Sequence, residues 1–134
     1  ILFDLPEVVE KVDSSLHLKI GGSFFDRFVI SADTFILKRV LHDWNDELSL
    51  KILQNCAKTM TGNSRLLIID GVLDRAKDKQ ALAAIDLALL TIFGGRERTF
   101  DQFQELTAKA GLEITLVTEL TDFLFAIECK IKQG

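Results

Sequence analysis

The sequence predicts an α/β fold in which helices cover a largely parallel sheet, and three observations lead to this prediction. Segments with strand-like and helix-like apolar periodicity alternate along the chain. The apolar run at residues 65–70 lacks in–out alternation, which is typical of a parallel strand buried on both faces. The 134 residues are 48% hydrophobic and 27% charged and contain no repeat or linker, so we expect one domain over residues 1–134.

The first elements are short. Residues 1–3 are typical of the end of a buried strand whose beginning is missing, so we expect the chain to be a fragment. Pro6 suits the first turn of a short helix over residues 6–12. Apolar residues alternate with polar ones over 16–20 and stop at a glycine pair, which predicts a short strand. Residues 33–40 predict a second, more buried strand.

A longer helix follows from Asn45, which suits its N-cap. Asp46 and Glu47 fall in the first turn, where the helix dipole favours negative charge. We expect Gly62 to close the helix. Its apolar stripe consists of Leu48, Ile52, Leu53, Cys56, Ala57 and Met60.

The second half continues the alternation. The strand over 65–70 ends in a carboxylate, and a helix from about 78 to 92 is apolar almost all round, so we expect protein to cover most of its sides. Thr99 and Gln102 form a capping box for the next helix, which ends before Gly111.

Two closing strands, over residues 113–120 and 123–131, complete the chain. The connection between them is so short that they must run antiparallel. Phe123, Phe125 and Ile127 begin a row of apolar residues along one face of the second strand.

Composition excludes several classes of function. A formal charge of −4 and a pI of about 5.1 provide no basic field for nucleic acid or anionic lipid. The longest apolar region, 81–93, falls short of the ~18–20 residues that span a bilayer. Cys56 and Cys129 have no metal-ligand spacing, and we expect two buried thiols in a reducing cytosol. We therefore expect a cytoplasmic protein without nucleic-acid or membrane partners.

The segment richest in chemistry is LKRVLHDWNDE at residues 37–47. It lies between the C-terminal end of a predicted strand and the N-terminus of a helix, where open α/β sheets bind ligands. His42, followed by Asp43 and Trp44, has the parts of a general base and a stacking surface. On these residues alone, a solvated turn is the more common interpretation.

This segment resembles the signature of the small-molecule S-adenosylmethionine-dependent O-methyltransferases, the family of caffeate, hydroxyindole and polyketide O-methyltransferases. Further segments agree in order and spacing: FDLP at 3–6, GGSFF at 21–25, KILQNC at 51–56 and GGRERT at 94–99. The resemblance implies a partial class I methyltransferase sheet, Rossmann-like, from the C-terminal part of the domain. It lacks the first strand and most of the second and carries an antiparallel C-terminal strand.

The resemblance also implies catalytic roles. His42 matches the family's general base, and Glu97 matches the carboxylate that holds the imidazole. Asp70 falls where many members carry a second such acid. A phenol with a pKa near ~10 is mostly neutral at pH 7, and a histidine with a pKa near ~6.5 can take its proton, contributing ~10²–10⁴-fold. This chemistry requires no metal.

Five positions match residues that contact the cofactor, S-adenosylmethionine. Asp4 matches the acid that binds the ribose hydroxyls, and Phe24 matches the apolar residue packed against adenine. Lys38 and Trp44 match further contacts, while Ser23 stands where aspartate is commoner. Structural alternatives remain open: Asp4 as a helix cap, Trp44 as a core residue, Lys38 with its stem along the surface, and Glu97 as a surface charge. We interpret His17 as a surface residue.

The resemblance implies an enzyme that transfers a methyl group to a hydroxyl of a small aromatic or polyketide-like acceptor and works as a homodimer. A family member carries its glycine-rich loop and a helical dimerisation domain upstream of residue 1, so we expect this chain alone to be inactive and to bind the cofactor weakly. Because the chain lacks the first strand and most of the second strand of the family's sheet, we expect residues 16–20 either to pair directly with 33–40 or to self-associate. The alternative function is a non-catalytic, truncated module that acts only through protein association, and a third is another reaction on the same scaffold.

Overall fold

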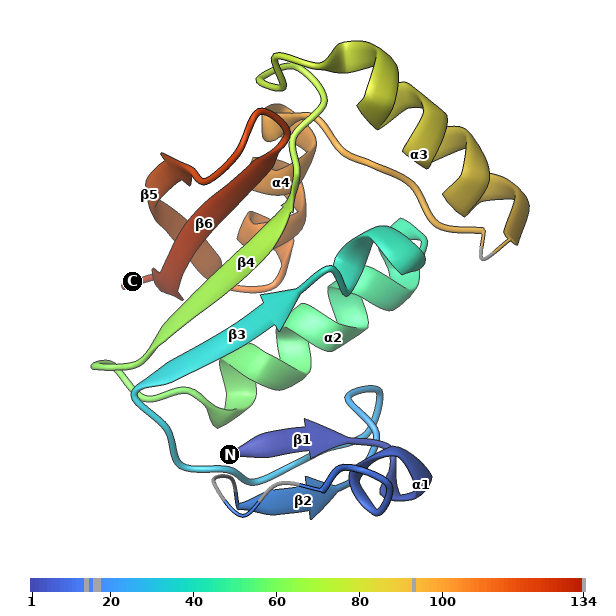
Figure 1. Ribbon diagram of the computed structural model, residues 1–134. Coiled ribbons are helices and arrows are strands. Elements are labelled where there is room, and N and C mark those ends of the chain that lie inside the picture. Colours follow the sequence, from blue (N-terminus) through green and yellow to red (C-terminus); the bar gives the residue numbers. More distant parts are fainter. Residues whose placement is uncertain (14, 16–17, 93, 134) are drawn as a thin grey trace.

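The computed structural model describes residues 1–13, 15, 18–92 and 94–133. Strands and helices alternate, which confirms the α/β class (Figure 1). The elements are β1 (Leu2–Asp4), α1 (Pro6–Val9), β2 (Lys19–Gly21), β3 (Thr34–Lys38), the 3-10 turn η1 (Leu41–Asp43), α2 (Asp46–Thr59), β4 (Arg65–Gly71), α3 (Lys79–Ile92), α4 (Phe100–Lys109), β5 (Leu112–Glu119) and β6 (Leu124–Ile131). No described helix combines the length and apolar character needed to cross a membrane. The assignment of residues 1–134 to one domain stays a prediction.

The larger sheet has four strands in the order β3-β4-β6-β5. β3 and β4 are parallel, with Thr34 opposite Arg65 and Lys38 opposite Ile69. β6 runs antiparallel to both β4 and β5, which confirms the predicted antiparallel C-terminal strand. In β6, Phe125, Ile127 and Cys129 are buried on one face, as their alternation predicted.

A second, two-stranded sheet corrects the predicted pairing of residues 16–20 with 33–40. β2 pairs in parallel with β1, with Leu2 opposite Lys19 and Asp4 opposite Gly21. Although β1 is only three residues long, it offers its own hydrogen-bonding edge, and its first amide donates to the Leu18 carbonyl at 2.8 Å. Residues 16 and 17, which carry part of the predicted strand and His17, lie outside the described residues.

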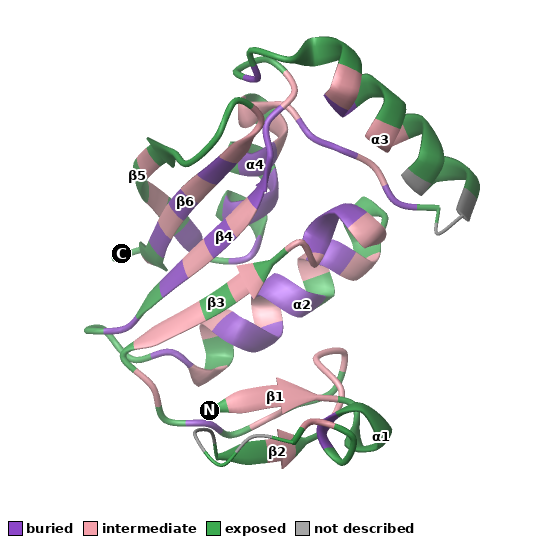
Figure 2. Ribbon diagram, in the orientation of Figure 1, coloured by how far each residue is buried: buried purple, intermediate pink, exposed green. Residues whose placement is uncertain are grey.

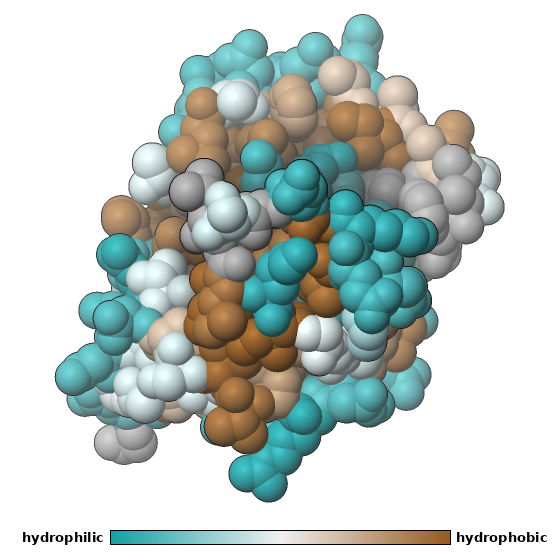
Figure 3. Space-filling model, turned by 60° about the horizontal axis from the view of Figure 1, so that its bottom comes forward, coloured by the Kyte–Doolittle hydropathy of each residue, from teal (hydrophilic) through white to brown (hydrophobic). Residues whose placement is uncertain are grey.

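β3 is an edge strand of the larger sheet and is less buried than expected. Its side chains are half-buried or exposed, and Ile36 is 59% exposed because it lies on the face opposite Phe35 and Leu37, which pack against the core. Figure 1 shows the β1–β2 sheet on this side of β3. Figure 3 shows apolar residues gathered in the middle of the face that this part of the molecule presents, within a hydrophilic rim. An exposed apolar patch of this kind favours contact with another surface, because burial removes it from water.

The core lies between the larger sheet and helices α2 and α4, which pack against each other. Leu66 and Ile68 of β4 are fully buried, whereas the alternate residues Leu67 and Ile69 are half-buried. The prediction of burial on both faces is therefore wrong for one face, since α2 and α4 cover only the other. Figure 2 shows the buried residues following this pattern along β4 and α2.

The caps of α2 and α4 fix where the chain enters both helices. Asn45 Oδ1 accepts from the Leu48 amide at 3.0 Å, which confirms the predicted N-cap. Thr99 and Gln102 form both bonds of the predicted capping box. The end of α2 differs from the prediction: the chain turns extended at Met60, so Gly62 does not close the helix.

α3 is more exposed than its apolar sequence predicted. Leu82 is fully buried, but Leu87 and Leu90 are 64% and 61% exposed. In Figure 2 most of the helix is coloured as exposed, because the described chain contacts it from one side only. The expectation that protein covers most of α3 is therefore wrong for this chain alone.

Candidate active site

The candidate site lies at the C-terminal edge of the parallel strands β3 and β4. The Arg39 amide donates to the Ile69 carbonyl at 2.9 Å and extends the ladder just past β3. The chain then enters η1, which carries His42, while Asp70 lies near the end of β4. Because parallel strands present their carboxyl ends at one edge, the two side chains meet there.

Glu97 reaches the same edge through an isolated parallel bridge. Val72, just after β4, pairs with Arg98, and the Leu73 amide donates to the Arg98 carbonyl at 2.9 Å. The Glu97 amide donates to Asp86 Oδ1 of α3 at 2.6 Å. These contacts hold the residue 95–98 segment beside β4, so the prediction that Glu97 lies near His42 is met by the fold.

The three side chains form one buried cluster. His42 Nδ1 lies 3.1 Å from Glu97 Oε1 and 3.8 Å from Asp70 Oδ1. The carboxylates of Asp70 and Glu97 are 0% exposed and the imidazole is 7% exposed. The alternative interpretation of Glu97 as a surface charge is therefore wrong. The short contact is a hydrogen bond that Nδ1–H donates to Glu97 when the histidine is neutral.

Arg98 holds the backbone around His42 in place. Its guanidinium donates to the Leu41 carbonyl at 2.9 Å, the Trp44 carbonyl at 2.9 Å and Ser49 Oγ at 3.0 Å. The side chain is fully buried and also binds Asp46 at 2.9 Å. Carbonyls on both sides of the histidine are therefore fixed by the residue that follows Glu97.

Glycine is required where the two segments touch. A Cβ on Gly95 would overlap the His42 carbonyl and lie 2.6 and 2.8 Å from backbone carbons of Asp43. A Cβ on Gly71 would lie 2.6 Å from Glu97 Oε2. Gly94 has a φ of 69°, in the left-handed region that favours glycine. The GG pair therefore allows the turn and the close approach that bring Glu97 to His42.

Burial and mutual charge shift the pKa values of the cluster. Burial by itself lowers the pKa of His42, but the hydrogen bond to Glu97 and the charge of Asp70 outweigh it, so the pKa lies above 6.5. Burial raises the pKa of Asp70 to about 7, against the opposing charge of His42. The groups titrate together, so apparent pKa values belong to the cluster.

The second imidazole nitrogen lies beside a partly exposed carboxylate. His42 Nε2 lies 3.3 Å from Asp43 Oδ1, and the Asp43 side chain is 36% exposed. The Asp43 carboxylate therefore occupies the hydrogen-bonding position of Nε2. Because Asp43 is exposed, its movement needs no rearrangement of the core.

Four of the five predicted cofactor positions line one cavity of about 130 Å³, between the ends of β1 and β2 and residue 44. Trp44 packs edge-on against Phe25, with centroids 4.8 Å apart. Asn55 of α2 donates to the Phe24 carbonyl at 2.9 Å and so fixes this wall. The lining residues are Asp4, Leu5, Gly22, Ser23, Phe24, Phe25 and Trp44.

The three polar residues among the predicted cofactor positions differ in their surroundings. Asp4 Oδ1 accepts from the Leu5 amide at 2.7 Å, so Asp4 both lines the cavity and shapes the start of α1. Ser23 Oγ accepts from the Phe25 amide at 3.2 Å. Lys38 is exposed at the end of β3 and is not part of this cavity, so the structure does not bring it together with the other four.

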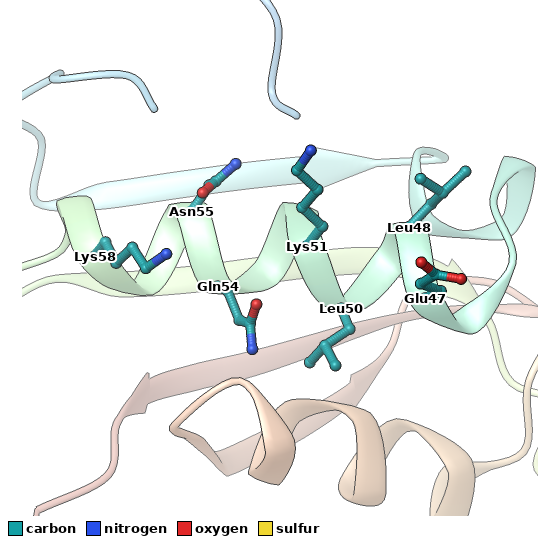
Figure 4. A pocket seen from close by; sticks show the side chains of 7 residues that line it. All are labelled: Glu47, Leu48, Leu50, Lys51, Gln54, Asn55 and Lys58. Atoms are coloured by element: carbon teal, nitrogen blue, oxygen red, sulfur yellow. The ribbon is translucent and has the colours of Figure 1, made fainter. Parts of the chain in front are cut away.

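A larger hollow of about 480 Å³ contains none of the predicted site residues. Figure 4 shows its lining side chains, which all come from α2 and fan out in different directions along the helix. They are Glu47, Leu48, Leu50, Lys51, Gln54, Asn55 and Lys58. Such a row along one helix offers no convergent polar groups.

The sequence interpretation missed Arg39 and Arg98. Arg39 has a φ of 56°, unusual for a residue with a side chain, and its Nη1 lies 3.6 Å from Glu97 Oε1. Both residues lie inside the motifs that carry the resemblance, so the motifs could have pointed to them, but a sequence does not show which arginine is buried.

Burial raises the pKa of the Cys56 and Cys129 thiols to about 12, so both stay protonated at neutral pH.

The sequence profile of the O-methyltransferase domain family matches residues 1–113. An isoflavone 4'-O-methyltransferase of Lotus japonicus is 38% identical over 135 residues, which cover 95% of this chain and 37% of that protein. The chain therefore spans little more than a third of the length of the curated relatives it matches.

Solved structures match as well. One structure, described as a pericyclic reaction enzyme, matches with a TM-score of 0.87 and 30% sequence identity. The match covers 98% of this chain and 36% of the chain of that enzyme. An O-methyltransferase from neocarzinostatin biosynthesis, in complex with S-adenosyl-L-homocysteine and 1,4-dihydroxy-2-naphthoic acid, has a TM-score of 0.75 and 35% identity, covering 84% and 33%. These matches confirm the predicted fold class, a partial methyltransferase sheet.

Proposed function

The chain belongs to the O-methyltransferase domain family, and from this premise we propose that the whole protein transfers a methyl group from S-adenosylmethionine to a hydroxyl of a small aromatic or polyketide-like molecule. The observation that carries the proposal is the buried His42–Glu97 pair, 3.1 Å apart, with a cavity that is lined by Asp4 and by Trp44, two residues after His42. A general base and an aromatic-walled cavity joined by one short segment of chain are two parts that such a transfer needs.

His42 acts as the base in this proposal. Glu97 accepts a hydrogen bond from Nδ1–H, which fixes the tautomer and puts the lone pair on Nε2, where it can take the hydroxyl proton once Asp43 moves aside. The imidazolium that forms is then stabilised by Glu97 and by Asp70, 3.8 Å away. Glu97 is a positioning residue, because it acts through His42.

The lining of the smaller cavity fits part of the cofactor. An apolar, aromatic wall suits a purine ring, and the Asp4 carboxylate can accept hydrogen bonds from two neighbouring ribose hydroxyls. When bound, S-adenosylmethionine supplies a methyl sulfonium that is already electrophilic. Trp44 and Phe24 exclude water from the ring, and Asp4 orients the sugar. We also propose a contact from Lys38 in the whole protein.

The cavity in this chain is too small for the whole cofactor. Its volume of about 130 Å³ compares with ~300–1,000 Å³ for pockets that enclose a drug-sized ligand. The remaining walls must come from other parts of the protein. This supports the proposal that the 134-residue chain alone binds the cofactor weakly and is inactive.

The exposed leucines of α3 support a covering partner. Leu87 and Leu90 are 64% and 61% exposed on one helix, and burying the exposed part of each gains roughly 1–2 kcal/mol. We propose that the rest of the protein, as a homodimer, covers this helix. The two buried free thiols, Cys56 and Cys129, support the further proposal of a reducing, cytoplasmic location.

A transfer assay with the full-length protein tests the proposed function. The protein is incubated with methyl-labelled S-adenosylmethionine and a panel of phenols, naphthols and their methyl ethers, which serve as matched controls. We expect label in the hydroxyl-bearing compounds and none in the ethers. A folded protein that binds the cofactor but labels no hydroxyl would contradict the proposal.

One comparison favours a second candidate function. Because a pericyclic reaction enzyme matches with a TM-score of 0.87, the same scaffold serves chemistry without methyl transfer. In that case the protein would consume no cofactor during turnover. Cofactor turnover therefore separates the two functions, and a protein with neither activity would fit the non-catalytic module.

A further inference from the structure

Two buried carboxylates in the cluster have free acceptor atoms. Among the described residues, Asp70 Oδ1 and Oδ2 and Glu97 Oε2 have no hydrogen-bond partner, although both side chains are 0% exposed. Buried carboxylate oxygens that lack a hydrogen-bond donor are costly. A positively charged ligand between them would satisfy these atoms.

The donor atoms already converge. One atom each from His42, Asp70 and Glu97 lies within 4.8 Å of the others, and the imidazole nitrogen is 3.1 and 3.8 Å from the two carboxylates. Zinc binds nitrogen and oxygen at ~2.0–2.2 Å in a tetrahedron, which separates neighbouring donors by roughly 3.3–3.6 Å. One imidazole and two carboxylates therefore stand near the spacing of three zinc ligands.

We propose that His42 Nδ1 and the carboxylates of Asp70 and Glu97 bind a divalent transition-metal ion such as zinc, and that this ion inhibits the enzyme. The inhibitory part rests on the proposed function of His42. A metal on Nδ1 takes the place of the Nδ1 proton. The neutral imidazole must then carry its proton on Nε2, so no lone pair remains to accept a proton from the hydroxyl.

Arg39 opposes this binding. Its Nη1 lies 3.6 Å from Glu97 Oε1, and its side chain is 31% exposed. The guanidinium can swing toward solvent, but its charge competes with a cation for Glu97. Replacing it with asparagine, which tolerates the left-handed φ of 56°, removes the charge and keeps the backbone conformation.

Calorimetric titration of the full-length protein with zinc chloride tests the site without using activity. We expect one ion per chain, at least tenfold weaker binding in Asp70→Asn and Glu97→Gln, and tighter binding in Arg39→Asn. Magnesium is the matched control. We expect it not to bind, because it demands oxygen ligands in an octahedron. If one variant does not fold, the remaining variants still decide the outcome.

Unchanged zinc affinity in the two carboxylate variants, or no zinc binding at all, would overturn the proposal. Methyl transfer is then measured with zinc and after chelation. We expect zinc to lower turnover at least tenfold and a chelator to restore it. Zinc that binds the cluster without affecting transfer would contradict the inhibitory part. Zinc binding in a protein without transfer activity would instead count against the proposed function, not against the site.

Discussion

His42 Nδ1 lies 3.1 Å from Glu97 Oε1, although the two residues are 55 positions apart in the sequence. One side chain comes from the turn after β3, and the other from a segment that bridges to the end of β4. Both are buried, so water does not compete for the hydrogen bond. The relationship makes the imidazole's basicity and orientation dependent on a residue that the chain supplies much later.

Glu97→Gln should change the pH dependence of methyl transfer. The hydrogen bond to Glu97 raises the pKa of His42, and the base must be neutral to act, so activity should rise with pH through an apparent pKa above 6.5. Without the carboxylate this rise should shift to lower pH, and turnover at the plateau should fall. kcat measured between pH 5 and 9 checks both effects. A pH profile that does not shift would mean that Glu97 does not raise the pKa of the general base.

The Asp70→Asn variant should gain stability relative to wild type as the pH rises. The pKa of Asp70 is raised to about 7 from 3.8, so in this window the folded chain keeps a proton that the unfolded chain has released. Stability from this group is fully present below about pH 4 and is lost as pH rises toward 7. The free energy of unfolding of the variant minus that of wild type should grow by up to ~1.4 kcal/mol per pH unit.

Denaturant titrations between pH 4 and 6 measure this difference. In that range His42 is mostly protonated in both states, since its pKa is near ~6.5 in the unfolded chain and higher in the folded one, and the other carboxylates cancel between the two proteins. A difference that stays constant with pH would mean that Asp70 is ionised throughout.

Gly95→Ala should displace the histidine. The added Cβ meets the backbone of His42 and Asp43, so the two segments must move apart, at a cost of ~1–3 kcal/mol. We expect turnover to fall more than tenfold. Gly62→Ala is the matched control, because a Cβ there meets nothing within 4 Å, and it should change stability by less than ~0.5 kcal/mol. Equal effects in the two variants would refute the close approach.

Arg98→Met should destabilise the protein far more than Arg96→Met. Both arginines bind Asp46, each at 2.9 Å, but Arg98 is buried and also satisfies the Leu41 and Trp44 carbonyls. Its loss leaves several buried acceptors unpaired, which should lower the free energy of unfolding by on the order of 3 kcal/mol. Arg96 is 42% exposed, so its ion pair contributes at most ~1 kcal/mol. Unfolding free energies of the two variants measure the contrast.

Periodicity predicted the local elements well. The N-cap of α2 at Asn45 and the capping box of α4 follow from side-chain chemistry within four residues, which a sequence displays directly. The exposure of Ile36 and Leu87 could not be predicted in this way, because it depends on which strands and helices lie beside them. An apolar sequence indicates that a face favours contact, and it does not identify what supplies the contact.

The candidate site was predicted through resemblance, since no local pattern joins His42 to Glu97. The resemblance supplied residues but not their surroundings. It did not show that Arg98 binds the backbone on both sides of His42, or that Asp43 lies 3.3 Å from Nε2. These contacts depend on how residues 95–98 lie against η1, which only the folded chain determines.

Methyl transfer by the His42→Ala variant of the full-length protein tests the central claim most directly. With saturating cofactor and an accepted hydroxyl compound, we expect turnover to fall at least a hundredfold, because general base catalysis contributes ~10²–10⁴-fold. Affinity for S-adenosylmethionine, measured by calorimetry on the same sample, should be unchanged. Turnover close to wild type in a variant that is folded and binds the cofactor would contradict the assignment of His42 as the base.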